Sequence, residues 1–356
     1  MNRQLMTALG IAAAAMIGSA HVAHAQIALG DVDRSATLRF SYVGAPAAYD
    51  PPFSKNRYQE TAFMLPVYDM LVRFDHNGDI VPSLATSWKF SDNGATLTMQ
   101  LRAGVKFTDG SDVNAAAVVR SLTRTRNDPN SLLAGQIGSI ASAEAGGPSI
   151  VVIHLNNPDA NVLYRLATSA GMIVSAQALD KGVNLGATPV GSGPYRLVSS
   201  GPQGANFERN EDYFDKSANQ FAKVSIVPIV DVTARLNALQ TGQIDAGLFQ
   251  SDQWPQIDRM VKTGKFTVYS VLGPNSLPLW LNTKVKPLDN PKVRLALAMA
   301  IDREAISQGI LNGRCEPAAQ PLQPGVIGHD PSLKAYKRDV AKAKALLQEA
   351  GVGPFS

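Results

Sequence analysis

Residues 78–122 constrain the fold more than any other part of the chain. The stretch reads GDIVPSLATSWKFSDNGATLTMQLRAGVKFTDGSDVNAAAVVRSL. Asp92-Asn93-Gly94 predicts a tight turn, because Asn and Gly tolerate positive φ. Residues 96–102 then alternate apolar and polar side chains, which is the period of a half-buried strand. Asn114 stands where a helix N-cap belongs, ahead of an apolar helical pattern. The stretch therefore predicts a compact strand-turn-strand-helix unit.

The rest of the chain alternates predicted strands with predicted helices, which indicates an α/β protein. The order of strand, helix and strand between residues 223 and 249 predicts a right-handed crossover. The predicted strands cover residues 37–43, 149–155, 223–229, 244–249, 266–271 and 278–281. The predicted helices cover residues 57–74, 160–168, 233–240, 291–301 and 339–350, with the first one interrupted at Pro66.

Several blocks of this sequence closely resemble the family 5 extracellular solute-binding proteins, which are the peptide- and nickel-type substrate receptors of ABC importers. The 78–122 stretch resembles the N-terminal lobe of that family. Four further blocks stand in the family's order and at about its spacing: PVGSGPY, ARLNALQTGQID, LNTKVKPLDNPKVRLALAMAIDREAI and DVAKAKALLQEAG. The resemblance covers nearly all of the chain after its N-terminal leader.

The resemblance implies an α/β, two-lobe periplasmic-binding-protein fold with a hinge. The first lobe would comprise residues 36–78 and 189–273, with a subdomain inserted at 79–188. The second lobe would begin at 274 and be incomplete at 356, because members of the family are substantially longer. A truncated gene product, a fragment and a natural short form all fit this length. We expect an incomplete lobe to expose apolar surface and to promote aggregation.

The function that the resemblance implies is reversible capture of a peptide or similar small solute between two lobes. The loaded protein, a monomer, would deliver the solute to ABC permease subunits in the inner membrane. Peptides, nickel chelates, opines and oligosaccharides all occur as ligands in this family. Two other classes stay open, namely a receptor that presents its ligand to a chemosensory or regulatory partner and a secreted α/β hydrolase.

The candidate ligand contacts lie in irregular segments at strand ends that would face the cleft. Two of them, Tyr49 and Trp280, offer flat amphipathic surfaces, although core packing also explains such aromatic residues. The polar candidates after residue 249 also fit helix capping or a solvated loop. The full set is Tyr42, Tyr49, Gln250, Ser251, Asn275 and Trp280.

The N-terminus has the pattern of a secretory signal peptide. Arg3 supplies the positive charge, residues 8–20 are apolar, and Ala23-His24-Ala25 is a small-x-small cleavage site. We expect cleavage after Ala25 and a periplasmic protein. The single cysteine, Cys315, cannot form an internal disulfide, so the fold must depend on buried apolar area.

Composition and motifs argue against other functions. The net charge of +4 comes from scattered residues, whereas a nucleic-acid surface needs a concentrated basic stripe. His76, His154 and His329 are far apart and show no metal-ligand spacing. The sequence has neither a GxSxG elbow nor a P-loop. We therefore expect no catalytic residue, no metal and no cofactor.

Overall fold

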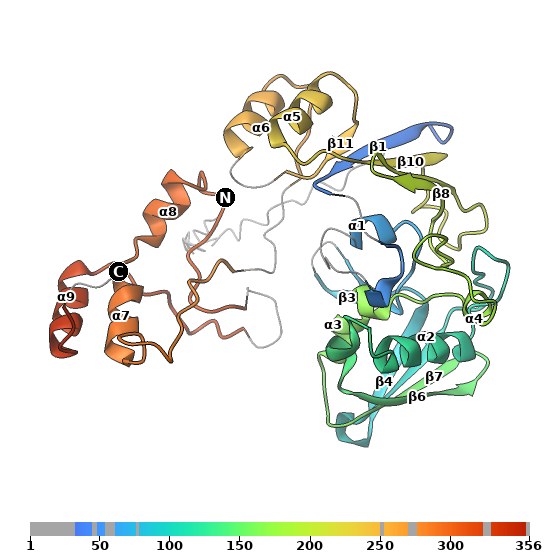
Figure 1. Cartoon of the computed structure of the whole chain (residues 1–356), viewed down its shortest axis with the longest axis horizontal. Coiled ribbons are helices and arrows are strands. Elements are labelled where there is room, and N and C mark those ends of the chain that lie inside the picture. Colours follow the sequence, from blue (N-terminus) through green and yellow to red (C-terminus); the bar gives the residue numbers. More distant parts are fainter. Residues whose placement is uncertain are drawn as a thin grey trace, which may run out of the picture.

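A computed structural model of the chain describes residues 33–44, 48–53, 61–75, 78–249, 253–269, 276–322 and 329–353 (Figure 1). The predicted signal peptide, with its cleavage site after Ala25, lies outside these ranges. Among the described residues, no helix combines the length and the apolar character that crossing a membrane requires.

A five-stranded sheet forms around the first strand, β1 (Thr37–Tyr42). β1 lies between β10 (Lys223–Pro228) and β11 (Ala246–Gly247) and runs parallel to both. Beyond β10, β9 (Gly204–Arg209) and β8 (Tyr195–Gly201) continue the sheet with antiparallel pairing. Helix α5 (Val232–Gln240) connects β10 to β11, which confirms the predicted strand-helix-strand order.

The 78–122 stretch folds into the predicted unit, within a second, antiparallel sheet. The order of this sheet is β4 (Ala85–Ser91), β5 (Thr96–Leu101), β7 (Ile150–Leu155) and β6 (Ile140–Gly147). Asn93 has a φ of 53° in the turn between β4 and β5, as the sequence predicts. The Asn114 side chain accepts a hydrogen bond of 2.9 Å from the Ala117 amide at the start of α2 (Ala115–Asn127). A short hairpin of β2 (Val72–Phe74) and β3 (Ile80–Pro82) precedes this sheet.

Four of the remaining helices begin at a side chain that caps them. Asp231, Asn290, Asp302 and Asp339 each accept a backbone hydrogen bond at the start of a helix, where Asp and Asn are favoured. In Figure 1 the sheets lie on the right, α5 and α6 at the top, and α7, α8 and α9 on the left. The helices not yet given are α1 (Thr61–Met64), α3 (Val162–Leu166), α4 (Ala176–Asp180), α6 (Trp254–Val261), α7 (Pro291–Ala300), α8 (Arg303–Gly309) and α9 (Val340–Glu349). Single 3-10 turns are η1 (Pro51–Phe53), η2 (Asp92–Gly94), η3 (Ala134–Ile137) and η4 (Ser169–Gly171).

Three predicted elements are wrong. The helix expected over 57–74 is only α1 within the described part, because the chain turns at Leu65–Val67 and then forms β2 against β3. The strands expected at 266–271 and 278–281 are irregular where the structure describes them. These two segments have strand-like composition, but no described strand lies beside them to complete a hydrogen-bonded ladder.

Most of the buried apolar side chains form one large cluster around the two main sheets. A second, small cluster consists of Leu236 from α5 and Trp254, Ile257 and Met260 from α6. Residues 276–322 and 329–353, called the C-terminal group below, have few buried apolar side chains. Leu277 is 86% exposed and Trp280 is 87% exposed.

The Gly191–Pro194 turn is fixed by close packing. A Cβ atom on Gly191 would lie 2.2 Å from the Val67 carbonyl oxygen, and one on Gly193 would lie 2.5 Å from the Val67 carbonyl carbon. Only glycine fits at such separations, because real Cβ atoms do not approach backbone so closely. The two glycines therefore allow the close approach of two backbone segments.

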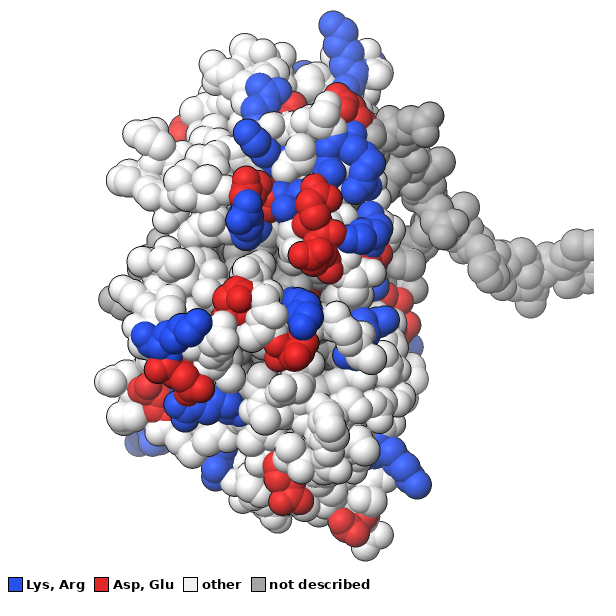
Figure 2. Space-filling view, turned by 90° about the vertical axis from the view of Figure 1, so that its right-hand side faces the viewer, with Lys and Arg blue, Asp and Glu red and all other residues white. Residues whose placement is uncertain are grey.

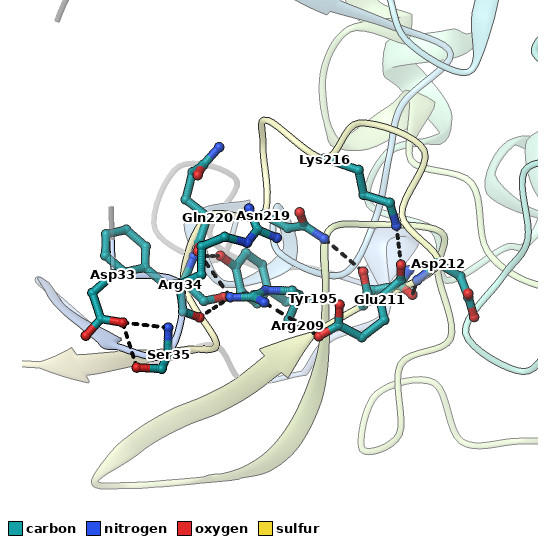
Figure 3. Close-up of polar contacts among 12 residues, drawn as sticks. Asp33, Arg34, Ser35, Tyr195, Arg209, Glu211, Asp212, Lys216, Asn219 and Gln220 are labelled. Carbon is teal, nitrogen blue, oxygen red and sulfur yellow. Dashed lines mark hydrogen bonds and ion pairs between the residues drawn. The ribbon is translucent and has the colours of Figure 1, made fainter. Parts of the chain in front are cut away.

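Arg209 at the end of β9 joins three backbone segments (Figure 3). Its Nε donates to the Phe221 carbonyl at 3.1 Å, and one terminal nitrogen donates to the Gln220 carbonyl at 3.1 Å and to the Arg34 carbonyl. The other terminal nitrogen lies 3.6 Å from a Glu211 carboxylate oxygen. These bonds hold the chain before β1 and the chain before β10 against the end of β9.

Charges of both signs are interspersed on the face that Figure 2 draws. Lys and Arg side chains there alternate with Asp and Glu, and form no stripe of one sign. A polyanion binds through a concentrated basic surface, so this face is poorly suited to nucleic acid.

Candidate functional site

A cavity of about 1670 Å³ lies between α5, α6 and the end of β11 on one side and the C-terminal group on the other. Pockets for drug-sized ligands measure roughly 300–1,000 Å³. The cavity is therefore large enough for a flexible ligand of several linked units. Most of the side chains along its wall are apolar.

Helix α6 forms one wall of the cavity. Its apolar residues Trp254, Ile257 and Met260 recur every three residues and so occupy one face. They pack against Leu236 of α5, and all four line the cavity. This helix was not predicted from the sequence, although the spacing of its apolar residues is a signal for it.

The opposite wall comes from the C-terminal group. Leu277, Leu279 and Trp280 project from an irregular segment and are 86%, 65% and 87% exposed. Leu297 and Ile301, from α7 and its C-cap, extend this apolar wall. Apolar walls of this kind bind a ligand by removing its hydrocarbon surface from water.

One carboxylate of the cavity wall, Asp245, is held by Arg39 of β1. Its Oδ1 lies 2.5 Å from the terminal nitrogen of Arg39, and its Oδ2 accepts from Arg39 Nε at 3.0 Å. The hydrogen bonds from Arg39, together with its charge, lower the pKa of Asp245. Both oxygens already accept hydrogen bonds, so this carboxylate serves the junction of β1 and β11.

Three arginines of the C-terminal group also line the cavity. The guanidinium of Arg314 lies 4.2 Å from the centre of the Trp254 ring, and one of its nitrogens donates to Asp258 Oδ1 at 3.1 Å. Arg294 donates to the carbonyls of residues 288 and 289, each at 3.0 Å. Arg303 donates to the Ala298 carbonyl at 2.8 Å. Arg294 and Arg303 bond to uncharged carbonyl groups, so their positive charge remains available to a negatively charged ligand group, whereas Arg314 is paired with Asp258.

The structure brings one of the predicted ligand contacts, Trp280, into the cavity wall. Gln250, Ser251 and Asn275 lie outside the described residues. Two described neighbours of that region, Phe249 and Trp254, line the cavity.

Tyr42 and Tyr49 lie away from this cavity. Tyr42, at the end of β1, is half-buried and makes an edge contact with Phe63, with 6.3 Å between the ring centres. Tyr49 is only 3% exposed and belongs to the large core cluster. Burial raises the pKa of Tyr49 to about 12. In the observed arrangement the Tyr49 ring packs in the core, and its role in binding stays a prediction.

The most perturbed carboxylate of the described residues is Asp69, which the sequence analysis did not single out. Its side chain is buried and accepts from the Tyr213 hydroxyl at 2.9 Å and from the Ser192 hydroxyl at 3.0 Å. Burial raises its pKa to about 6, against the opposing effect of these two bonds and of the Arg102 and Arg73 charges. Asp69 thus ties the Gly191–Pro194 turn to the core.

The parts of the chain that the structure describes hold no group of three or more His, Cys, Asp or Glu side chains that could bind a metal ion. His154 pairs with Glu144 at 3.3 Å on the antiparallel sheet, distant in sequence from the cavity residues. The arrangement of the cavity is that of a binding site: apolar walls with a few polar groups.

Comparison with known proteins gives consistent matches. Residues 79–354 match the model of the bacterial extracellular solute-binding proteins, family 5 Middle. The glutathione-binding protein GsiB of Salmonella typhimurium is 32% identical over 305 residues, which are 84% of this chain and 59% of that protein. NikZ of Campylobacter jejuni, solved with Ni(L-His), has a TM-score of 0.76 at 28% identity, over 88% of this chain and 63% of that one. DppA of Helicobacter pylori, a periplasmic binding protein solved with the peptide STSA, has a TM-score of 0.71 at 27% identity, over 89% and 66% of the two chains. The chain thus spans about 59% of the length of the curated relative it matches.

Proposed function

The chain belongs to family 5 of the bacterial extracellular solute-binding proteins, and from this premise we propose that it is the substrate-binding component of an ABC importer. Its fold is the two-lobe α/β fold of periplasmic binding proteins, as the solved relatives show. The single observation that carries the proposal is the large apolar cavity between α6 and the C-terminal group. A solute held there would touch both sides of the molecule.

In this proposal the first lobe comprises residues 36–78 and 189–273, and a subdomain is inserted at 79–188. The second lobe begins at 274. Contacts with both lobes would favour the closed arrangement, because a ligand shifts such an equilibrium only through its different affinity for the two states. Tyr42, Tyr49, Gln250, Ser251, Asn275 and Trp280 remain the candidate contacts. Trp280 is the one whose position on the cavity wall supports the assignment.

The solute that we propose is a peptide or a similar small polar molecule with apolar parts. The relatives named above bind glutathione, a nickel–histidine complex and a short peptide. An apolar wall suits hydrocarbon side chains, and the arginines at 294 and 303 suit a carboxylate. The protein would release the solute chemically unchanged.

The proposed location is the periplasm, after cleavage of the signal peptide behind Ala25. The proposed partners are ABC permease subunits in the inner membrane, to which the monomer would deliver its solute. ATP hydrolysis would take place on other subunits of the importer.

Thermal unfolding of the exported protein with a panel of reduced glutathione, the peptide STSA and Ni(L-His) tests the proposal. A ligand at 100 times its dissociation constant stabilises the native state by about 2.7 kcal/mol. We expect at least one member of the panel to raise Tm and gene deletion to abolish its uptake. Turnover of a panel member by the purified protein would refute the proposal and favour a hydrolase. Binding without any effect of deletion on uptake would refute the transport role and favour a receptor.

A further inference from the structure

Arg314 connects helix α6 with the C-terminal group. Its guanidinium stacks on Trp254 at 4.2 Å and donates to Asp258 at 3.1 Å, and both partners belong to α6. Arg314 itself follows α8 in the C-terminal group. Among the ion pairs of the described residues, this is the one that joins a residue before 270 to a residue after 276.

The two partners of Arg314 have different surroundings. Trp254 is only 8% exposed and is anchored in the small cluster with Ile257 and Met260. The Arg314 and Asp258 side chains are 38% and 42% exposed, so they can separate into water without burying a charge. The Trp254 ring stays in place, whereas the ion pair between Arg314 and Asp258 can break, so the contact can form and open reversibly.

The contact also lies on the wall of the cavity. Motion of the C-terminal group relative to α6 would change the shape of that cavity and would break the Arg314 contact. We propose that Arg314 is a positioning residue that fixes the angle between α6 and the C-terminal group. One consequence rests on the proposed function: the angle between α6 and the C-terminal group sets the affinity for the solute.

The expected size of the effect follows from the two interactions. An exposed ion pair and a partly buried cation–π contact together shift a two-state equilibrium by about tenfold. Loss of Arg314 therefore changes the populations of the arrangements without unfolding either part.

The test is a distance measurement between spin labels on Lys89→Cys and Lys344→Cys, in a Cys315→Ser background of the full chain. Both labelled positions are exposed, one on β4 and the other on α9. We expect one narrow distance distribution in this parent. Arg314→Gln and Asp258→Asn should each broaden and shift the distribution, and the double variant should add nothing further. Arg314→Lys, which keeps the charge, should stay nearer to the parent.

The control is Lys292→Gln, which breaks an ion pair of similar exposure within the C-terminal group, Lys292 to Glu349 at 2.9 Å. It should leave the distribution unchanged. If Arg314→Gln gives the parent's distribution, or if the control broadens it equally, the proposal is wrong. The measurement needs no ligand, so its outcome is independent of whether glutathione, STSA or Ni(L-His) binds.

Discussion

Asp69 predicts an unusual dependence of stability on pH. The usual carboxylate pKa of 3.8 rises to about 6 in the folded protein, because the side chain is buried. The folded state therefore binds a proton more tightly than the unfolded state. Between these two pKa values the folded state holds more protons, so the free energy of unfolding falls as pH rises. Below that window Asp69 is protonated in both states and the loss of stability is absent. Above about pH 6 Asp69 is ionised in both states and the loss of stability is complete.

The magnitude follows from the size of the pKa change. A shift of one pKa unit corresponds to about 1.4 kcal/mol, so a rise from 3.8 to about 6 corresponds to about 3 kcal/mol. Asp245 and Asp109 act in the opposite direction, because their pKa values are lowered. The total pH dependence therefore mixes several groups, and only a difference between two proteins isolates Asp69.

The assay compares urea unfolding of the parent and of Asp69→Asn from about pH 3.5 to about pH 7.5. Asparagine cannot ionise, so the stability of the parent relative to the variant should fall by about 3 kcal/mol across this range. Asp180→Asn is the control, because the Asp180 side chain is 70% exposed. Its difference from the parent should show no comparable fall. A parent-minus-Asp69→Asn difference that is flat or rises with pH would refute the reasoning.

Three other substitutions, one with a matched control, test an ion pair, a close backbone approach and a helix cap. Arg124→Gln should lower the free energy of unfolding by about 3–5 kcal/mol in urea, because it leaves the buried Asp50 carboxylate without the guanidinium that lies 2.8 Å away. Gly193→Ala should lower the free energy of unfolding by about 4 kcal/mol or more, because the added Cβ would lie 2.5 Å from the Val67 backbone. Its control is Gly201→Ala, where the added Cβ meets open space, and this variant should unfold near the parent's Tm. Asn114→Ala should cost about 1 kcal/mol in the same urea titration, since it removes the α2 cap, and an equal stability for this variant would contradict the capping role.

Local features of the fold were predictable from the sequence. The cap at Asn114, the turn at Asp92–Gly94 and the helix that begins at Pro291 each depend on residues within a few positions of one another. Such signals act through backbone geometry that is the same in any protein. The family resemblance supplied the two-lobe architecture, which the solved relatives confirm.

The failures arose where distant partners decide the structure. Val72–Phe74 reads as the end of a helix, but it pairs with Ile80–Pro82 and becomes a strand. The 278–281 segment has the composition of a strand and lacks a described neighbour to pair with. Strand propensity expresses packing against neighbouring strands, so composition alone could not decide either case.

In the candidate site, too, some residues could be predicted from the sequence and others depend on distant partners. Trp280 was predicted because its flat amphipathic ring suits a ligand contact, and it lies on the cavity wall. Tyr49 satisfied the same criteria, but it is packed in the core. Arg314 and Asp258 are 56 positions apart, and neither has a motif of its own. A contact between two such residues exists only because α6 and the C-terminal group meet, so it could be found only from the folded chain. Residues that hold the two parts together should accordingly be sought among such long-range pairs rather than among sequence motifs.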